Sequence, residues 1–125
     1  MRSRLNLEAT RRFAERRERE NSAARLLAEV PDLVSLDLSL SESRGEMAGG
    51  VTHVRHIVVG SAPALFEIPC GDPSCKEGGH DLTYEIVRAL RQRATESDGR
   101  DTCNGSVGSA SCGRDLHFRA IAVYR

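Results

Sequence analysis

Four cysteines are the residues of this sequence whose type and spacing indicate chemistry. They form two pairs, Cys70 with Cys75 and Cys103 with Cys112. The residues within each pair are mostly Gly, Ser, Asp, Asn and Pro, which favour turns. Turns can bring two thiolates onto one ion, and a tetrahedral zinc site needs four such donors. The sequence therefore predicts that the four cysteines bind one structural zinc ion.

The spacing of the cysteines leaves alternatives open. The pairs read C-x4-C and C-x8-C, whereas the strongest zinc signature is C-x2-C. Two disulfides, four free thiols or an iron–sulfur cluster would use the same residues. Residues 1–8 are not followed by the apolar core of a signal peptide, so we expect a reducing, cytoplasmic compartment in which disulfides are rare. Compartment and loop chemistry therefore favour zinc, in a site that is zinc-ribbon-like in ligand type alone.

His80 is a fifth candidate ligand. It lies in the sequence Gly-Gly-His-Asp, just before an expected helix. Three cysteines and His80 would also make a closed zinc site. As an alternative, His80 could hydrogen-bond to a thiolate without touching the metal. We expect four cysteine ligands, with His80 outside the set.

The sequence lacks the motifs of the common metal-dependent and nucleophilic enzymes. A zinc deaminase needs His-x-Glu followed by Pro-Cys-x-x-Cys. Pro69 and Cys70 repeat only the start of that second motif, and no His-x-Glu occurs. The chain also has no His-Glu-x-x-His, P-loop or Gly-x-Ser-x-Gly motif. We therefore predict that the protein is not an enzyme and that its metal is structural.

The pattern of apolar residues predicts the elements that must position the cysteines. Segments rich in Ala, Leu, Glu and Arg favour helix, and alternating or β-branched apolar residues favour strands. We expect helices over residues 7–30 and 81–94, strands over residues 33–40, 51–59, 64–68 and 116–124, and polar loops over residues 41–50 and 95–102. The first helix has only charged residues from 15 to 20, so it is either an exposed arm or breaks near Asn21 and Ser22.

These elements indicate an α+β fold. We expect an antiparallel sheet of about four strands, with strand 51–59 central and the helix that begins at Asp81 across one face. Within strand 33–40, one face should carry Val34, Leu36, Leu38 and Leu40. The predicted domains are a charged helix or arm over residues 1–30 and a zinc-binding α+β domain over residues 31–125.

Charge and composition limit the partners. The 125-residue chain has a formal net charge of zero, which argues against a general polyanion binder. Residues 1–30 carry eight Arg and five Glu, a local excess of three positive charges. No apolar run reaches the length needed to span a membrane. We therefore predict a protein-interaction or regulatory module that binds a protein partner or self-associates. The alternative is a nucleic-acid-binding module that uses the arginines of residues 2–25 and 88–93.

Overall fold

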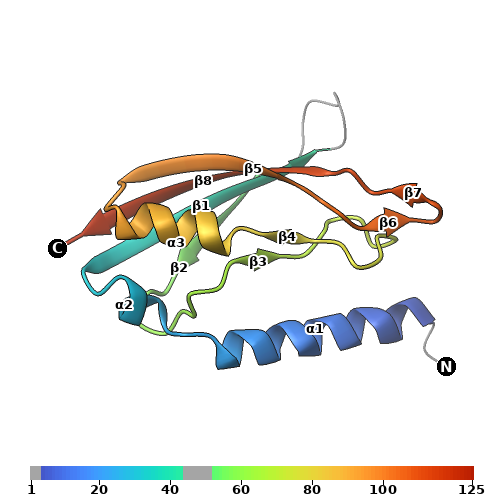
Figure 1. Ribbon diagram of the computed structural model, residues 1–125, viewed down its shortest axis with the longest axis horizontal. Coiled ribbons are helices and arrows are strands. Elements are labelled where there is room, and N and C mark those ends of the chain that lie inside the picture. The colour runs from blue at the N-terminus through green and yellow to red at the C-terminus, as the bar shows by residue number, and fades with distance from the viewer. Residues whose placement is uncertain (1–3, 44–51) are drawn as a thin grey trace.

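A computed structural model describes residues 4–43 and 52–125, which form an α+β fold (Figure 1). The elements in chain order are α1 (Arg4–Ser22), α2 (Leu26–Glu29), β1 (Leu33–Ser43), β2 (Thr52–Ile57), β3 (Glu67–Ile68), β4 (His80–Asp81), α3 (Thr83–Arg91), β5 (Glu96–Thr102), β6 (Ser106–Val107), β7 (Ala110–Ser111) and β8 (Asp115–Tyr124). The main sheet is antiparallel, in the order β2-β1-β8-β5, and α3 covers one of its faces. The α+β class and the four-stranded antiparallel sheet are confirmed.

The core lies between α3 and the middle strands of the main sheet. Strands β1 and β8 pair Leu36 with Ala122 and Leu38 with Ala120, and all four side chains are buried. Three buried side chains contact them from the helix side: Leu82 at the N-cap of α3, and Ile86 and Leu90 within it. Fully burying one such Leu or Ile side chain stabilises the fold by about 1.5–3 kcal/mol.

The predicted face of strand β1 is wrong at one residue. The pairing with β8 shifts register between Leu33 and Ser35. Because an extra residue in a strand changes which side chains face the core, Leu33 is buried while Val34 is 47% exposed. Simple alternation in the sequence could not reveal this bulge.

Two strand predictions need correction because residues 64–68 lie outside the main sheet and residues 96–102 lie within it. Prolines 63 and 69 flank the first segment, and only β3 within it pairs, with β4 in a separate two-stranded sheet. The fourth strand of the main sheet is β5, which was predicted as a polar loop. This strand forms an edge beside β8, where polar residues are tolerated. Its Gly99 lies against the ring of Phe118, so a Cβ there would be 2.7 Å from that ring.

Strand β2 is an edge strand, not the predicted central one. It pairs with β1, and five of its six residues are exposed. β-Branched residues favour any pleated surface, so their abundance does not distinguish an edge from a centre. Residue 51 and most of the predicted loop over 41–50 lie outside the described residues.

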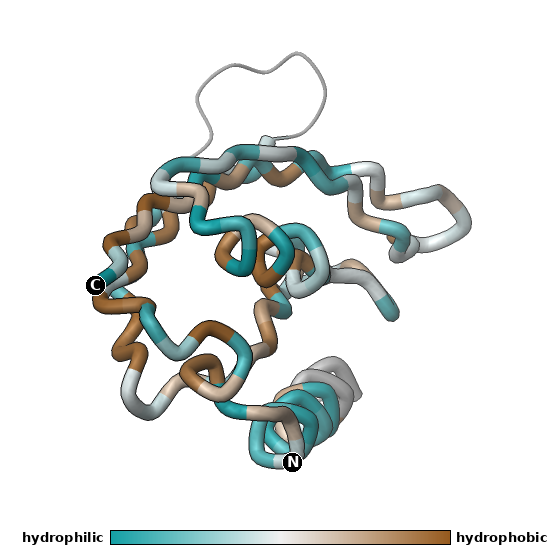
Figure 2. Tube along the Cα trace, turned by 60° about the vertical axis from the view of Figure 1, so that its left-hand side comes forward, coloured by the Kyte–Doolittle hydropathy of each residue, from teal (hydrophilic) through white to brown (hydrophobic). Residues whose placement is uncertain are grey.

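The N-terminal helix breaks close to the predicted point, since α1 ends at Ser22 and α2 begins at Leu26. Leu26 and Val30 are buried in the core. By contrast, none of the side chains described in α1 is buried. Figure 2 shows α1 as a largely hydrophilic segment that lies apart from the main sheet.

Helix α3 begins two residues later than predicted. Asp81 belongs to β4, and Leu82 occupies the N-cap position. The Asp81 carboxylate nevertheless accepts a hydrogen bond from the Thr83 N–H at 3.1 Å. At the other end, Arg93 has a positive φ of 57°. This left-handed conformation cannot continue a helix, so α3 ends before Ala94.

Candidate metal centre

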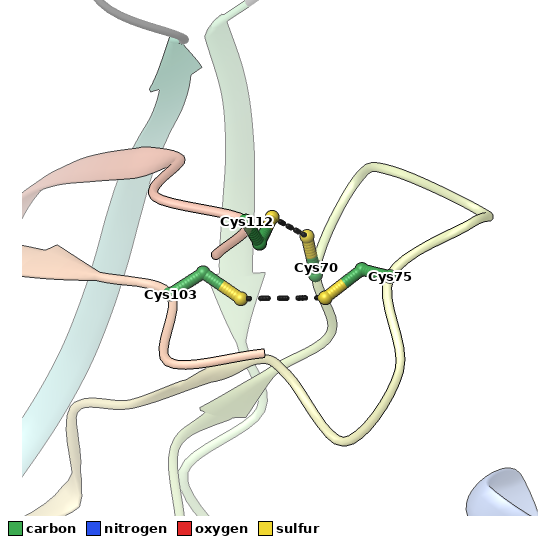
Figure 3. A group of neighbouring side chains, drawn as sticks. All are labelled: Cys70, Cys75, Cys103 and Cys112. Atoms are coloured by element: carbon green, nitrogen blue, oxygen red, sulfur yellow. Dashed lines mark hydrogen bonds between the residues drawn. The ribbon is translucent and has the colours of Figure 1, made fainter. Parts of the chain in front are cut away.

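The four cysteines converge at the end of the main sheet farther from α3 (Figures 1 and 3). Their Sγ atoms all lie within 4.8 Å of one another. The Sγ atoms of Cys70 and Cys112 are 3.6 Å apart, as are those of Cys75 and Cys103. Four thiolates bound tetrahedrally at 2.3 Å would have sulfur atoms about 3.8 Å apart. The predicted convergence is confirmed, and the arrangement is compatible with one metal ion.

Two loops bring the sulfur atoms together. Cys70 and Cys75 lie in the loop after β3, while Cys103 follows β5 and Cys112 follows β7. The loops are joined by an antiparallel bridge in which Lys76 and Ser106 exchange backbone hydrogen bonds of 2.7 and 3.0 Å. This bridge holds the loop of Cys70 and Cys75 against the loop of Cys103 and Cys112.

Two glycines make space for the sulfur atoms. A Cβ at Gly78 would lie 2.4 Å from the Sγ atoms of both Cys75 and Cys103. A Cβ at Gly105 would lie 2.3 Å from the Cys75 Sγ and 2.6 Å from the Gly78 Cα. Any larger residue at these positions would therefore separate the loops.

Backbone N–H groups also point at the sulfur atoms. Cys103 Sγ accepts hydrogen bonds from the N–H groups of Gly79, at 3.3 Å, and Gly105, at 3.4 Å. Burial acts to raise the pKa of Cys103, but these two donors together with hydrogen bonds from Cys75 and Cys112 outweigh it and lower that pKa to about 7. Burial raises the pKa of Cys75 to about 11 and also raises that of Cys70. Because metal ligation requires thiolates, a metal ion at this cluster would displace protons from it.

His80 lies outside the sulfur cluster, as expected. Its imidazole is fully buried, with Nδ1 2.7 Å from Asp101 Oδ2 and Nε2 3.0 Å from Glu42 Oε2. Both ring nitrogens therefore face carboxylates, and the alternative in which His80 bonds to a thiolate is wrong. Among the described residues, the group of side chains that could hold a metal ion consists of the four cysteines.

Sequence reasoning missed the carboxylate of Glu42. It accepts hydrogen bonds from Arg114 Nε at 2.5 Å and from the Gly71 N–H at 2.9 Å, besides facing His80. Burial acts to raise the pKa of Glu42, but the bonds from Arg114, Gly71 and His80 outweigh it and lower that pKa. Glu42 precedes the first cysteine by 28 positions in a polar stretch. No local pattern in the sequence marks its role.

Comparison with known proteins adds no further constraint. No protein-family model, no curated protein and no solved structure matches this chain. None of the helices among the described residues has the length and apolar character needed to cross a membrane. The zinc-ribbon-like description therefore stays a prediction.

Proposed function

We propose that the four cysteines hold one structural zinc ion in a protein-interaction module, which self-associates through the face of the main sheet opposite α3. The zinc would fasten the loops at one end of the sheet and take no part in a reaction. Four sulfur ligands leave no open coordination position for a substrate. The observation that carries the interaction role is the group of apolar side chains exposed on that face among the described residues.

The size of the sulfur cluster favours a single ion. An iron–sulfur cluster must fit several iron and sulfide atoms between its thiolates. All four Sγ atoms lie within 4.8 Å of one another, which leaves room for one ion between them and none for several iron and sulfide atoms. Zinc accepts four thiolates in tetrahedral geometry and supplies folding free energy when bound. These features support zinc over an iron–sulfur cluster.

The face of the sheet opposite the core carries four exposed β-branched residues, which we call the outer patch (Val34, Val54, Ile121 and Val123). Their exposed fractions are 47%, 69%, 45% and 52%, in that order. Such residues are well suited to a pleated surface that another protein covers. In contrast, the core-facing side chains of β1 and β8 are buried beneath α3.

Charges beside the outer patch favour a second copy of the chain as its partner. On the same face, acidic Glu96 and Asp98 of β5 pair in register with Ile121 and Arg119 of β8. Both signs of charge therefore border the apolar residues. Glu96 and Arg119 pair with each other at the surface of the chain. A twofold-related copy presents the same charges, so it can exchange this weak surface pair for one across the interface.

The alternative function, nucleic-acid binding, is less well supported. Four of the arginines that would contact phosphates pair with groups of this chain: Arg12 with the Cys75 carbonyl, Arg19 with Glu67, Arg91 with Glu29 and Arg93 with Asp32. Binding to phosphates would require these pairs to break. The zero net charge of the chain also provides little long-range attraction for nucleic acid.

Sedimentation of the full chain tests the interaction role. We expect a concentration-dependent dimer, which the double substitution Ile121→Asp and Val123→Asp should reduce to a monomer. Tyr84→Asp is the matched control, because Tyr84 is 75% exposed on α3, away from the outer patch. A wild-type chain that stays monomeric at high concentration would contradict the proposal. So would a double variant that still dimerises.

A further inference from the structure

One carboxylate links three backbone segments around the cysteine cluster. Glu42 lies near the end of β1, where its Oε1 accepts from the Gly71 N–H and from Arg114, while its Oε2 faces His80. Gly71 directly follows Cys70, and Arg114 lies two residues after Cys112. Glu42 thus joins both cysteine loops to a strand of the main sheet.

The third contact reaches the remaining cysteines. His80 is preceded by Gly79, whose N–H donates to Cys103 Sγ. The other ring nitrogen of His80 faces Asp101, two residues before Cys103. Holding His80 therefore holds the segment that follows Cys75 against the segment that enters Cys103.

These contacts are shielded from solvent, which makes the Glu42 carboxylate difficult to replace. The Glu42 side chain is 15% exposed, and that of His80 is fully buried. A charge in such a place is stabilised only when its hydrogen-bonding capacity is satisfied, and removing one partner is strongly destabilising. Both Glu42 oxygens have partners, and no buried polar side-chain atom is unsatisfied among the described residues.

We infer that Glu42 is the positioning residue of the cysteine cluster. It fixes the two loops against β1, so that the four sulfur atoms are gathered before a metal ion arrives. The inference deepens the proposed zinc site, since loops that are already placed lose less conformational freedom on binding the ion. Glu42 itself does not touch the sulfur atoms, and its effect passes through Gly71, His80 and Arg114.

Zinc affinity, measured by competition with a chromophoric chelator, tests this inference. The substitution Glu42→Gln keeps the size of the side chain but removes its negative charge, so the ion pair with Arg114 is lost and the two positions no longer both accept hydrogen bonds. We expect affinity to fall by about 10- to 100-fold, the range for groups that orient metal ligands. Glu96→Gln is the matched control, because Glu96 pairs with Arg119 at the exposed edge β5. The control should bind zinc as the wild type does.

Absorption of the cobalt-substituted protein distinguishes positioning from general stability. Wild type and Glu42→Gln should both show four-thiolate coordination at saturation, with the variant requiring more cobalt. Equal affinities of wild type and Glu42→Gln would overturn the inference. If Glu42→Gln does not fold, Arg114→Gln takes its place, since it removes one of the three contacts. Unchanged zinc affinity in that variant would overturn the inference as well.

Hydrogen exchange in the metal-free chain separates this inference from the proposed zinc site. The Gly71 amide donates to Glu42, so it should be protected in the wild type and lose protection in Glu42→Ala, which removes both accepting oxygens. A wild type that binds no zinc would defeat the zinc proposal. Hydrogen exchange would then be the test of whether Glu42 positions the loops. Equal protection of the Gly71 amide in the metal-free wild type and variant would overturn the inference.

Discussion

Two regions of the molecule are held together by different interactions. Between α3 and the main sheet, leucine and isoleucine side chains form an apolar core. At the other end of the sheet, the cysteine cluster is surrounded by glycines and ion pairs. The first region contains Leu36, Leu38 and Ile86, all buried. The second contains the cysteine cluster and the contacts of Glu42. Apolar burial is non-directional, while hydrogen bonds and metal ligation require particular atoms at particular distances. We therefore expect substitutions in the two regions to fail in different ways.

The largest effect on the cysteine region should come from removing one ligand. We expect Cys103→Ser to lose tight zinc binding, because the structural ion depends on four thiolates. Because the ion would fasten the two cysteine loops together, the amides of these loops, including Lys76 and Ser106, should exchange faster when it is lost. Amides between β1 and β8 should keep most of their protection. Hydrogen exchange with mass spectrometry measures both regions in one experiment, and uniform loss of protection would contradict the separation between them.

A core substitution should produce the opposite pattern. Ile86 is fully buried on α3, so Ile86→Ala should lower the free energy of unfolding by about 2–5 kcal/mol. Zinc stoichiometry in the folded variant should not change, because Ile86 is not part of the cysteine cluster. Denaturant titration and metal analysis check the two results. Loss of zinc from a folded Ile86→Ala chain would show that the regions are coupled.

A smaller change should disrupt the cysteine cluster by steric crowding alone. In Gly105→Ala the new Cβ would meet the Cys75 Sγ and the Gly78 Cα, neither of which can move without separating the loops. We expect zinc affinity to fall by about 10- to 100-fold, as for other groups that position ligands. Gly108→Ala is the control for losing a glycine from the same hairpin, since a Cβ there meets no atom within 4 Å. An alanine at the positive φ of this position, 62°, would cost stability, but its Cβ would not crowd the sulfur atoms. Chelator competition on both variants should rank Gly105→Ala as the weaker binder.

The smallest effect should follow deletion of residues 1–22. Helix α1 buries none of its described side chains, and it contacts the cysteine loops through Arg12, whose Nη1 donates to the Cys75 carbonyl at 2.9 Å. The deletion stops before Leu26, because that residue is fully buried in the core. We expect the shortened chain to fold and to bind zinc with only a slight loss of affinity. An insoluble or metal-free truncation would show that α1 is required by the rest of the fold.

The sequence predicted the apolar region better than the polar one, for physical reasons. Burial against a sheet imposes a period on a helix, so Leu82, Ile86 and Leu90 could be found by spacing alone. Cysteines and turn residues likewise identified the cluster. Strand β5 was missed because a polar edge strand has no apolar alternation. Glu42 was missed because its partners are brought to it by the fold, across 29 to 72 positions of sequence.

Metal analysis of the purified full-length protein, combined with native mass spectrometry, tests the central claim most directly. Four sulfur atoms within 4.8 Å of one another should hold one ion between them. We predict one zinc per chain, with all four cysteines reduced after the metal is removed. Two disulfides and no metal, or iron and sulfide in place of zinc, would contradict the account.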